Sequence, residues 1–194
     1  MKLKFTYPLA AVLLAGSLLS SCGSKEVAVQ EGEEIMIIPC SGSEYFTDEE
    51  TFRANAFGES IDLNTAKNKA LSNARAQLAT DIQSVMKLVG DNYVVSREVN
   101  NREEVLERFE QNARTVVNQT LMGVRQICEV STRTRNSDDQ ELFRYYVAIE
   151  LSADALTQKY YNALSSDEVV RIDYNYERFK ETFEEEMDNY RNGN

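Results

Sequence analysis

The chain has 194 residues, which suits one modest globular domain, and it carries 32 Asp+Glu against 21 Lys+Arg, for a formal net charge of -11. Nucleic acid is not an expected partner, because phosphate binding requires clustered Lys and Arg, and the basic residues here are scattered singly among carboxylates. The chain has no His, which excludes Ser-His and Cys-His nucleophile pairs and every metal site that uses imidazole.

The first 22 residues predict a bacterial lipoprotein signal peptide. Lys2 and Lys4 precede a short apolar run that ends in the lipobox Leu19-Ser20-Ser21-Cys22. The run is shorter than the roughly 20 apolar residues that cross a bilayer. We therefore expect residues 1–21 to be removed and Cys22 to become a lipidated N-terminus, whose acyl chains anchor the protein stably to a membrane. Removal would leave 19 basic residues against 32 acidic ones, a net charge of -13.

Residues 22–33 contain few apolar side chains and predict a flexible tether. The leader resembles those of Gram-negative lipoproteins, in which a non-acidic residue after the lipidated Cys permits sorting to the outer membrane, and Gly23 is non-acidic. The acidic residues Glu31, Glu33 and Glu34 leave export to the cell surface open. We expect an outer-membrane lipoprotein of the cell envelope that faces either the periplasm or the surface.

The next part of the chain predicts two strands and one long helix. Strands are expected over Glu34–Cys40, which contains Ile35-Met36-Ile37-Ile38, and over Thr51–Phe57. Residues 62–88 lack Gly and Pro, and apolar residues recur every four positions, which predicts a helix with one apolar face and a stop at Gly90. The side chains of that face are Ala66, Ala70, Ala74, Leu78, Ile82 and Met86.

A strand, a helix and a hairpin are predicted next. Tyr93–Val99 resembles a strand, and Asn101 with Glu104 resembles the capping box of a helix. The hairpin has arms over residues 122–135 and 142–151, and its second arm alternates apolar and polar side chains strictly, as in a half-buried antiparallel strand.

Two helices complete the expected elements, one over residues 152–164 and one that starts at Ser165. This order predicts an α+β fold over residues 34–164, in which a long Ala-rich helix and further helices pack on one face of an antiparallel sheet. Residues 165–194 are expected to add an acidic amphipathic helix at the C-terminus.

The order of these motifs resembles the LPP-twenty family of small bacterial outer-membrane lipoproteins. The resemblance covers about residues 50–155. It is carried by Phe52-Arg53-Ala54, Gly58, Ala66, Ala70, Ala74-Arg75-Ala76, Leu78-Ala79, Ile82 and the strand Phe143–Leu151. It implies the fold and the lipoprotein class; it supplies no catalytic residues, and motility, to which some members are tied, is not carried over. The acidic C-terminal helix departs from the family pattern.

Cys40 and Cys128 remain after lipidation of Cys22, and both lie in or next to predicted strands. An exported protein can form a disulfide between them. Two buried thiols that lie too far apart to bond are the alternative, because the sequence does not supply the Cα separation of about 4.4 to 6.8 Å that a disulfide requires.

One apolar stripe in the C-terminal region has two interpretations. It can pack back on the domain as core, which is the usual role of an apolar helix face, or it can serve as a partner or self-association surface. The stripe consists of Val169, Ile172, Tyr176, Phe179, Phe183 and Met187.

We therefore expect a lipid-anchored, non-enzymatic structural or protein-interaction module, with no cofactor and no metal. Its expected partners are the membrane, through the acyl chains, and an envelope protein or a second copy. The acidic clusters do not match a Ca²⁺-loop pattern and indicate solvated faces. The alternative is a binding module for a small ligand, a lipid or a peptidoglycan fragment, with Tyr93, Tyr145 and Tyr146 as candidate lining residues.

Overall fold

The computed structural model describes residues 32–97 and 101–193. The chain divides into two compact units, Met1–Met36 and Ile37–Asn194. The predicted leader, Cys22 and nearly all of the predicted tether lie outside the described residues. None of the helices in the described part of the chain is long and apolar enough to span a membrane.

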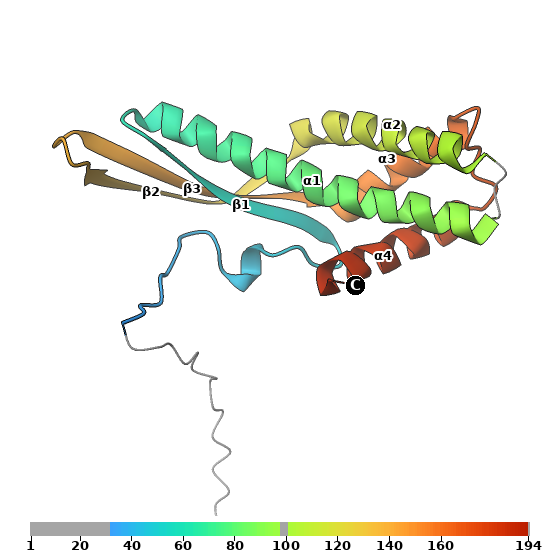
Figure 1. Ribbon diagram of the computed structural model, residues 1–194, viewed down its shortest axis with the longest axis horizontal. Coiled ribbons are helices and arrows are strands. Elements are labelled where there is room, and N and C mark those ends of the chain that lie inside the picture. Colours follow the sequence, from blue (N-terminus) through green and yellow to red (C-terminus); the bar gives the residue numbers. More distant parts are fainter. Residues whose placement is uncertain (1–31, 98–100, 194) are drawn as a thin grey trace, which may run out of the picture. The chain divides into compact units, whose positions relative to one another are not determined.

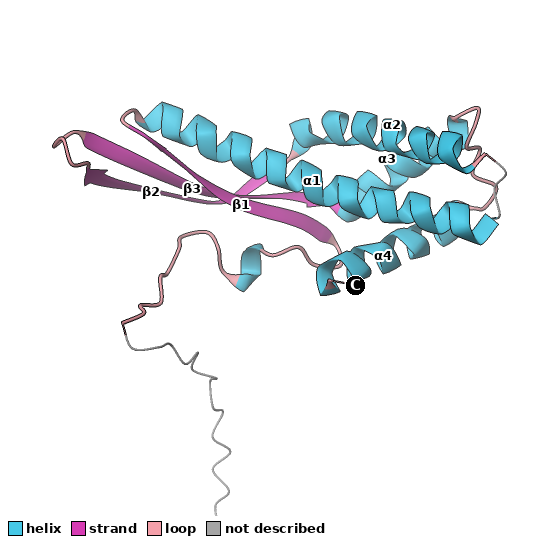
Figure 2. Cartoon of the chain, in the orientation of Figure 1, coloured by secondary structure: helices cyan, strands magenta, loops and turns pink. Residues whose placement is uncertain are grey.

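In its described residues, the unit from Ile37 onward is an α+β domain with three antiparallel strands and four α-helices (Figures 1 and 2). The predicted fold class is confirmed. Two short 3-10 helices lie at Ser43–Tyr45 and Leu121–Gly123. In chain order the other elements are β1 (Thr51–Ser60), α1 (Leu63–Arg97), α2 (Arg102–Thr120), β2 (Arg125–Arg135), β3 (Glu141–Ser152), α3 (Ala153–Ser166) and α4 (Tyr176–Asn192).

Strand β3 is central in the sheet, whose order is β1-β3-β2. The face predicted to be buried in the second hairpin arm is confirmed by Tyr145, Val147, Ile149 and Leu151; on the other face Arg144 is exposed, but Ala148 is buried as well. We call the side that carries Tyr145, Val147, Ile149 and Leu151 the inner face. Helix α1 packs against β1 and β3 on this side.

Helix α1 approaches β1 very closely at Gly58. A Cβ atom at this position would lie 2.3 Å from the carbonyl oxygen of Ala66 and 2.6 Å from the amide nitrogen of Ala70. Both are backbone atoms, which a rotamer change cannot move aside. The fully buried alanines at positions 66, 70 and 74 complete this contact, so the Ala-rich face of the helix and the glycine of the strand serve one close packing.

Replacement of Gly58 by Ala should therefore force α1 away from the sheet and lower the free energy of unfolding by about 1–3 kcal/mol. The matched control is Gly123→Ala, because a Cβ there would meet nothing within 4 Å. Urea unfolding followed by circular dichroism measures both. Equal stability of the two variants would contradict the close approach.

The predicted end of the long helix at Gly90 is wrong, since α1 continues to Arg97. Gly90 lies inside the helix, where a Cβ would be 3.1 Å from the side chain of Phe109 on α2. The small size of Gly90 permits close packing between the two helices, and the residue does not act as a left-handed helix stop.

The predicted strand at Tyr93–Val99 is also wrong in its described part: Tyr93 is helical, and its ring centroid lies 5.3 Å from that of Phe109. Tertiary burial outweighs the β-propensity of this segment.

Helices α2 and α4 pack against α1, and α3 packs against both α2 and α4. Tyr160 lies fully buried among them, with its ring 6.3 Å from Phe109 and 5.9 Å from Phe179. Its hydroxyl donates to the carbonyl oxygens of Phe109 (3.2 Å) and Met86 (3.4 Å), so the one polar atom of this ring is satisfied. Burial raises its pKa well above the ordinary value of 10.0.

The predicted helix start at Ser165 is wrong. Helix α3 runs to Ser166, and the carboxylate of Asp167 then accepts hydrogen bonds from the amides of Val169 (2.9 Å) and Val170 (3.1 Å). This local turn competes with helix formation. The last helix begins only at Tyr176, where Asn175 caps it by accepting the amide of Arg178 at 3.1 Å.

The predicted first strand, Glu34–Cys40, is wrong as well. These residues have no strand structure, and Ile37 and Ile38 are 94% and 48% exposed. This apolar run, although rich in residues that favour strands, therefore pairs with none of the described strands.

Candidate interaction site

The face of the sheet opposite the inner face carries a row of apolar side chains. The strand register places Phe57 of β1 and Val130 of β2 on either side of Tyr146 of β3. The rings of Phe57 and Tyr146 lie 5.9 Å apart, while Phe57 remains 54% and Val130 39% exposed. We call this face the outer face and this row of three residues the apolar belt. It is an exposed apolar surface on a rigid scaffold.

Charged rows lie on both sides of the apolar belt. On one side Glu150 pairs with Arg53 at 3.4 Å and accepts from Nε of Arg125 at 2.8 Å. On the other side Arg144 pairs with Glu59. The outer face thus has an apolar centre and a polar rim, which is the usual composition of a protein–protein interface.

A segment that we call the strap, residues 40–48, is fixed at both ends to the outer face. At one end Cys40 forms a disulfide with Cys128 of β2, with a Cα–Cα separation of 5.7 Å. The bonded alternative for these two cysteines is therefore the one present in the structure. Ala148, which lies between Cys128 and Asn55 in the register, is completely buried.

Arg53 fixes the other end of the strap. Its guanidinium donates to the carbonyl oxygen of Phe46 at 2.9 Å and pairs with Asp48. The hydroxyl of Thr47 accepts from the Arg53 amide at 2.9 Å and donates to the Arg53 carbonyl at 3.2 Å. The strap therefore runs from β2 to β1 and follows the sheet through covalent and polar contacts.

The electrostatics of this end favour the ion pair. Burial alone would raise the pKa of Asp48, but hydrogen bonds from Arg53 and from the amide of Glu50 outweigh it and lower this pKa below 3.8. Burial likewise opposes ionisation of Arg53, but Asp48 and Glu150 outweigh it and raise its pKa above the ordinary value of arginine. A lowered carboxyl pKa means that the contact supports folding above pH 3.8 and loses this contribution as the pH falls through the lowered value.

The second half of the C-terminal stripe belongs to the core. Phe179, Phe183 and Met187 are buried, and the ring of Phe183 meets that of Phe52 in β1 at 6.3 Å. Of the two interpretations, core packing is therefore the correct one for these three residues. The remaining members, Val169, Ile172 and Tyr176, are half-buried, and the first two precede α4.

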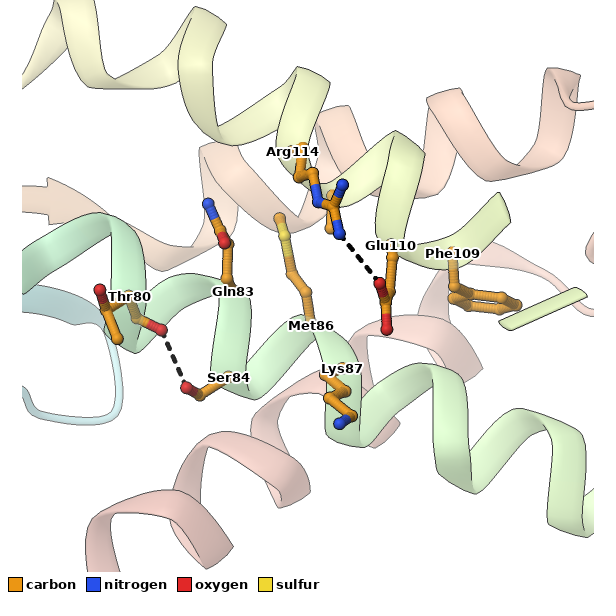
Figure 3. Close-up of a pocket in the computed structure, with 9 residues that line it drawn as sticks. Thr80, Gln83, Ser84, Met86, Lys87, Phe109, Glu110 and Arg114 are labelled. Atoms are coloured by element: carbon orange, nitrogen blue, oxygen red, sulfur yellow. Dashed lines mark hydrogen bonds and ion pairs between the residues drawn. The ribbon is translucent and has the colours of Figure 1, made fainter. Parts of the chain in front are cut away.

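A groove between α1 and α2 is the best candidate for a small-ligand site (Figure 3). Its volume is about 270 Å³, and Met86 and Phe109 contribute its apolar wall. Several of its polar groups already have partners: Arg114 pairs with Glu110 at 3.1 Å, and the hydroxyl of Ser84 donates to the carbonyl of Thr80 at 2.9 Å. Ligand pockets usually measure about 300–1,000 Å³ and direct free polar groups inward, so this groove is a weak site.

The three tyrosines proposed as ligand-lining residues do not share one site. Tyr93 lies in the helical core, where it packs against Phe109 and Tyr174. Tyr145 lies on the inner face, with its hydroxyl on Glu129, and Tyr146 lies on the outer face. Across residues 32–97 and 101–193, no group of three or more His, Cys, Asp or Glu side chains is placed to hold a metal ion.

Sequence reasoning did not identify the apolar belt. The alternation in β3 separates Tyr146 from the buried face, but Phe57 and Val130 join it only through a register that links strands far apart in the chain. Comparison with protein-family models found no matching family, and comparison with curated proteins found no matching relative. The resemblance to the LPP-twenty family stays a prediction.

Proposed function

We propose that this chain is a lipid-anchored protein of the bacterial cell envelope, and that its domain is a non-enzymatic protein-interaction module. The observation that carries the proposal is the Cys40–Cys128 disulfide. Disulfides persist in exported proteins and are rare in the cytosol, so this bond agrees with a leader that ends in a lipobox at Cys22. Membership of the LPP-twenty family is part of the same proposal.

The outer face supports the interaction part of the proposal. The disulfide fixes the chain that leads from the lipidated Cys22 to the same face that carries the apolar belt. The chain that follows the anchor would then enter the domain on the same face as the partner surface. Capture of a small ligand between the helices has less support, because the groove is small and several of its polar groups are paired.

Membrane fractionation of cells that produce the full chain tests the anchor. Wild-type protein should sediment with the membranes and incorporate labelled palmitate, whereas Cys22→Ala should do neither, because the thiol that accepts the lipid is missing. The matched control is Cys128→Ala, which also removes one thiol but should leave both anchoring and labelling intact. Wild-type protein that stays in the soluble fraction would contradict the proposal.

A further inference from the structure

The two edges of the sheet differ in how their backbone groups are used. At the free edge of β1, the hydroxyl of Thr47 occupies both the amide and the carbonyl of Arg53. The carbonyl of Phe57 accepts from Asn73 at 3.2 Å, and that of Glu59 accepts from Lys69 at 3.0 Å. Side chains from the strap and from α1 therefore block this edge.

The contacts at the β1 edge, together with the strand register, also show which backbone groups of β2 are directed to the open edge of the sheet. The odd-numbered residues of β1 direct their backbone amide and carbonyl groups away from β3. Successive residues of an antiparallel strand direct these groups to opposite sides of the strand. By the register, Val130 and Thr132 of β2 bond to β3, so Glu129, Ser131 and Arg133 direct their amides and carbonyls to the open edge. In the part of the chain that the structure describes, no hydrogen bond occupies these outward groups.

We propose that the open edge of β2 pairs with the β2 edge of a second copy of this chain, in an antiparallel arrangement whose two-fold axis passes beside Ser131. Each copy would then place Glu129 opposite Arg133 of the other, and Ser131 opposite Ser131. The two sheets become one six-stranded sheet. An open strand edge of 11 residues is a template for such pairing, and the same patch serves both partners, as a two-fold interface requires.

Charge selects this register among its neighbours. An axis at Val130 would place Arg125 opposite Arg135, and like charges directly opposite one another destabilise a strand pair. An axis at Thr132 also gives Glu129 an Arg partner, but it shortens the overlap of the strands. The axis at Ser131 gives two Glu–Arg pairs and uses the regular part of β2, which begins after the register shift between Gln126 and Cys128.

The same pairing brings the outer faces of the two copies side by side. Val130 of one copy lies opposite Thr132 of the other, and this contact occurs twice. Thr132 lies in the row of Arg144 and Glu59, so the two apolar belts lie offset by two residues, and each ends against the charged row of the other copy. This inference does not rest on lipid anchoring, so it can fail while the anchor is found, or hold while the anchor fails.

Cysteine crosslinking tests the register directly. In the full chain, Ser131→Cys should form an intermolecular disulfide on mild oxidation, because the two residues face each other across the axis. Thr115→Cys, at an exposed position of α2, and the wild-type protein are the controls, and the wild type also reports any crosslinking through Cys22. Crosslinking of Ser131→Cys no greater than in these controls would overturn the proposal.

A charge exchange gives a second, non-covalent test. Sedimentation equilibrium of the full chain in detergent should show a wild-type dimer. Arg133→Glu, which faces Glu129 of the partner, should dissociate roughly tenfold more readily. The double variant Glu129→Arg/Arg133→Glu should restore the wild-type dissociation constant. Arg114→Glu, which changes the charge of a similarly exposed arginine on α2, should not change it. A monomeric wild type, or no restoration by the double variant, would contradict the pairing.

Discussion

Replacement of Phe183 by Ala should lower the free energy of unfolding by about 3–5 kcal/mol, the usual cost of a large cavity in a core. The side chain is fully buried on α4, and its ring meets that of Phe52 edge to face at 6.3 Å. Its loss would remove the contact that joins the last helix to β1. Urea denaturation followed by circular dichroism measures the effect as a shift in the midpoint at an unchanged slope.

Phe46→Ala is the matched control, since the Phe46 side chain is 59% exposed on the strap. Its effect should stay within about 0.5 kcal/mol. A loss of stability in Phe183→Ala as small as that of the control would mean that α4 does not pack as core, and would return its stripe to the role of an exposed partner surface.

Removal of the disulfide in the double variant Cys40→Ser/Cys128→Ser should lower the free energy of unfolding by about 2–4 kcal/mol. The bond joins residues that are separated by 88 positions, so it restricts the unfolded chain strongly. The strap would then keep only the polar contacts of its other end, with Arg53 and with the carbonyl of Thr51. Thermal unfolding with and without dithiothreitol measures the loss.

The reductant provides the control for this prediction. Wild-type protein should fall to the stability of the double variant when dithiothreitol is added, whereas the double variant should not respond. Equal stability of oxidised wild type, reduced wild type and double variant would show that the strap is not held by a disulfide in solution.

Local patterns predict the elements whose sequence and environment agree. The alternation from Phe143 to Leu151 and the four-residue repeat from Ala66 to Met86 each match one buried face. Local sequence patterns give wrong predictions where tertiary contacts determine the structure. Gly90 resembles a helix stop, but it is a packing contact with Phe109, and no local signal distinguishes the two.

The candidate site is harder to predict, because its parts come from distant segments. Cys40 and Cys128 meet only when the strap crosses the sheet, and Phe57 and Val130 meet Tyr146 only through the register. The Ile35–Ile38 run has the composition of a strand but finds no partner among the described strands. A single sequence does not show which distant segments pair with each other. The elements of this fold are therefore predictable, but the contacts between distant elements are not.

We propose that the outer face of the sheet is the surface that contacts a partner. Site-specific photocrosslinking in cells, with a photoreactive residue in place of Phe57 in the full chain, would detect this contact. Val95, a similarly exposed apolar residue on α1, is the matched control position. A discrete crosslinked product is expected from position 57 and none from position 95. No product at position 57, or the same products at both positions, would contradict it.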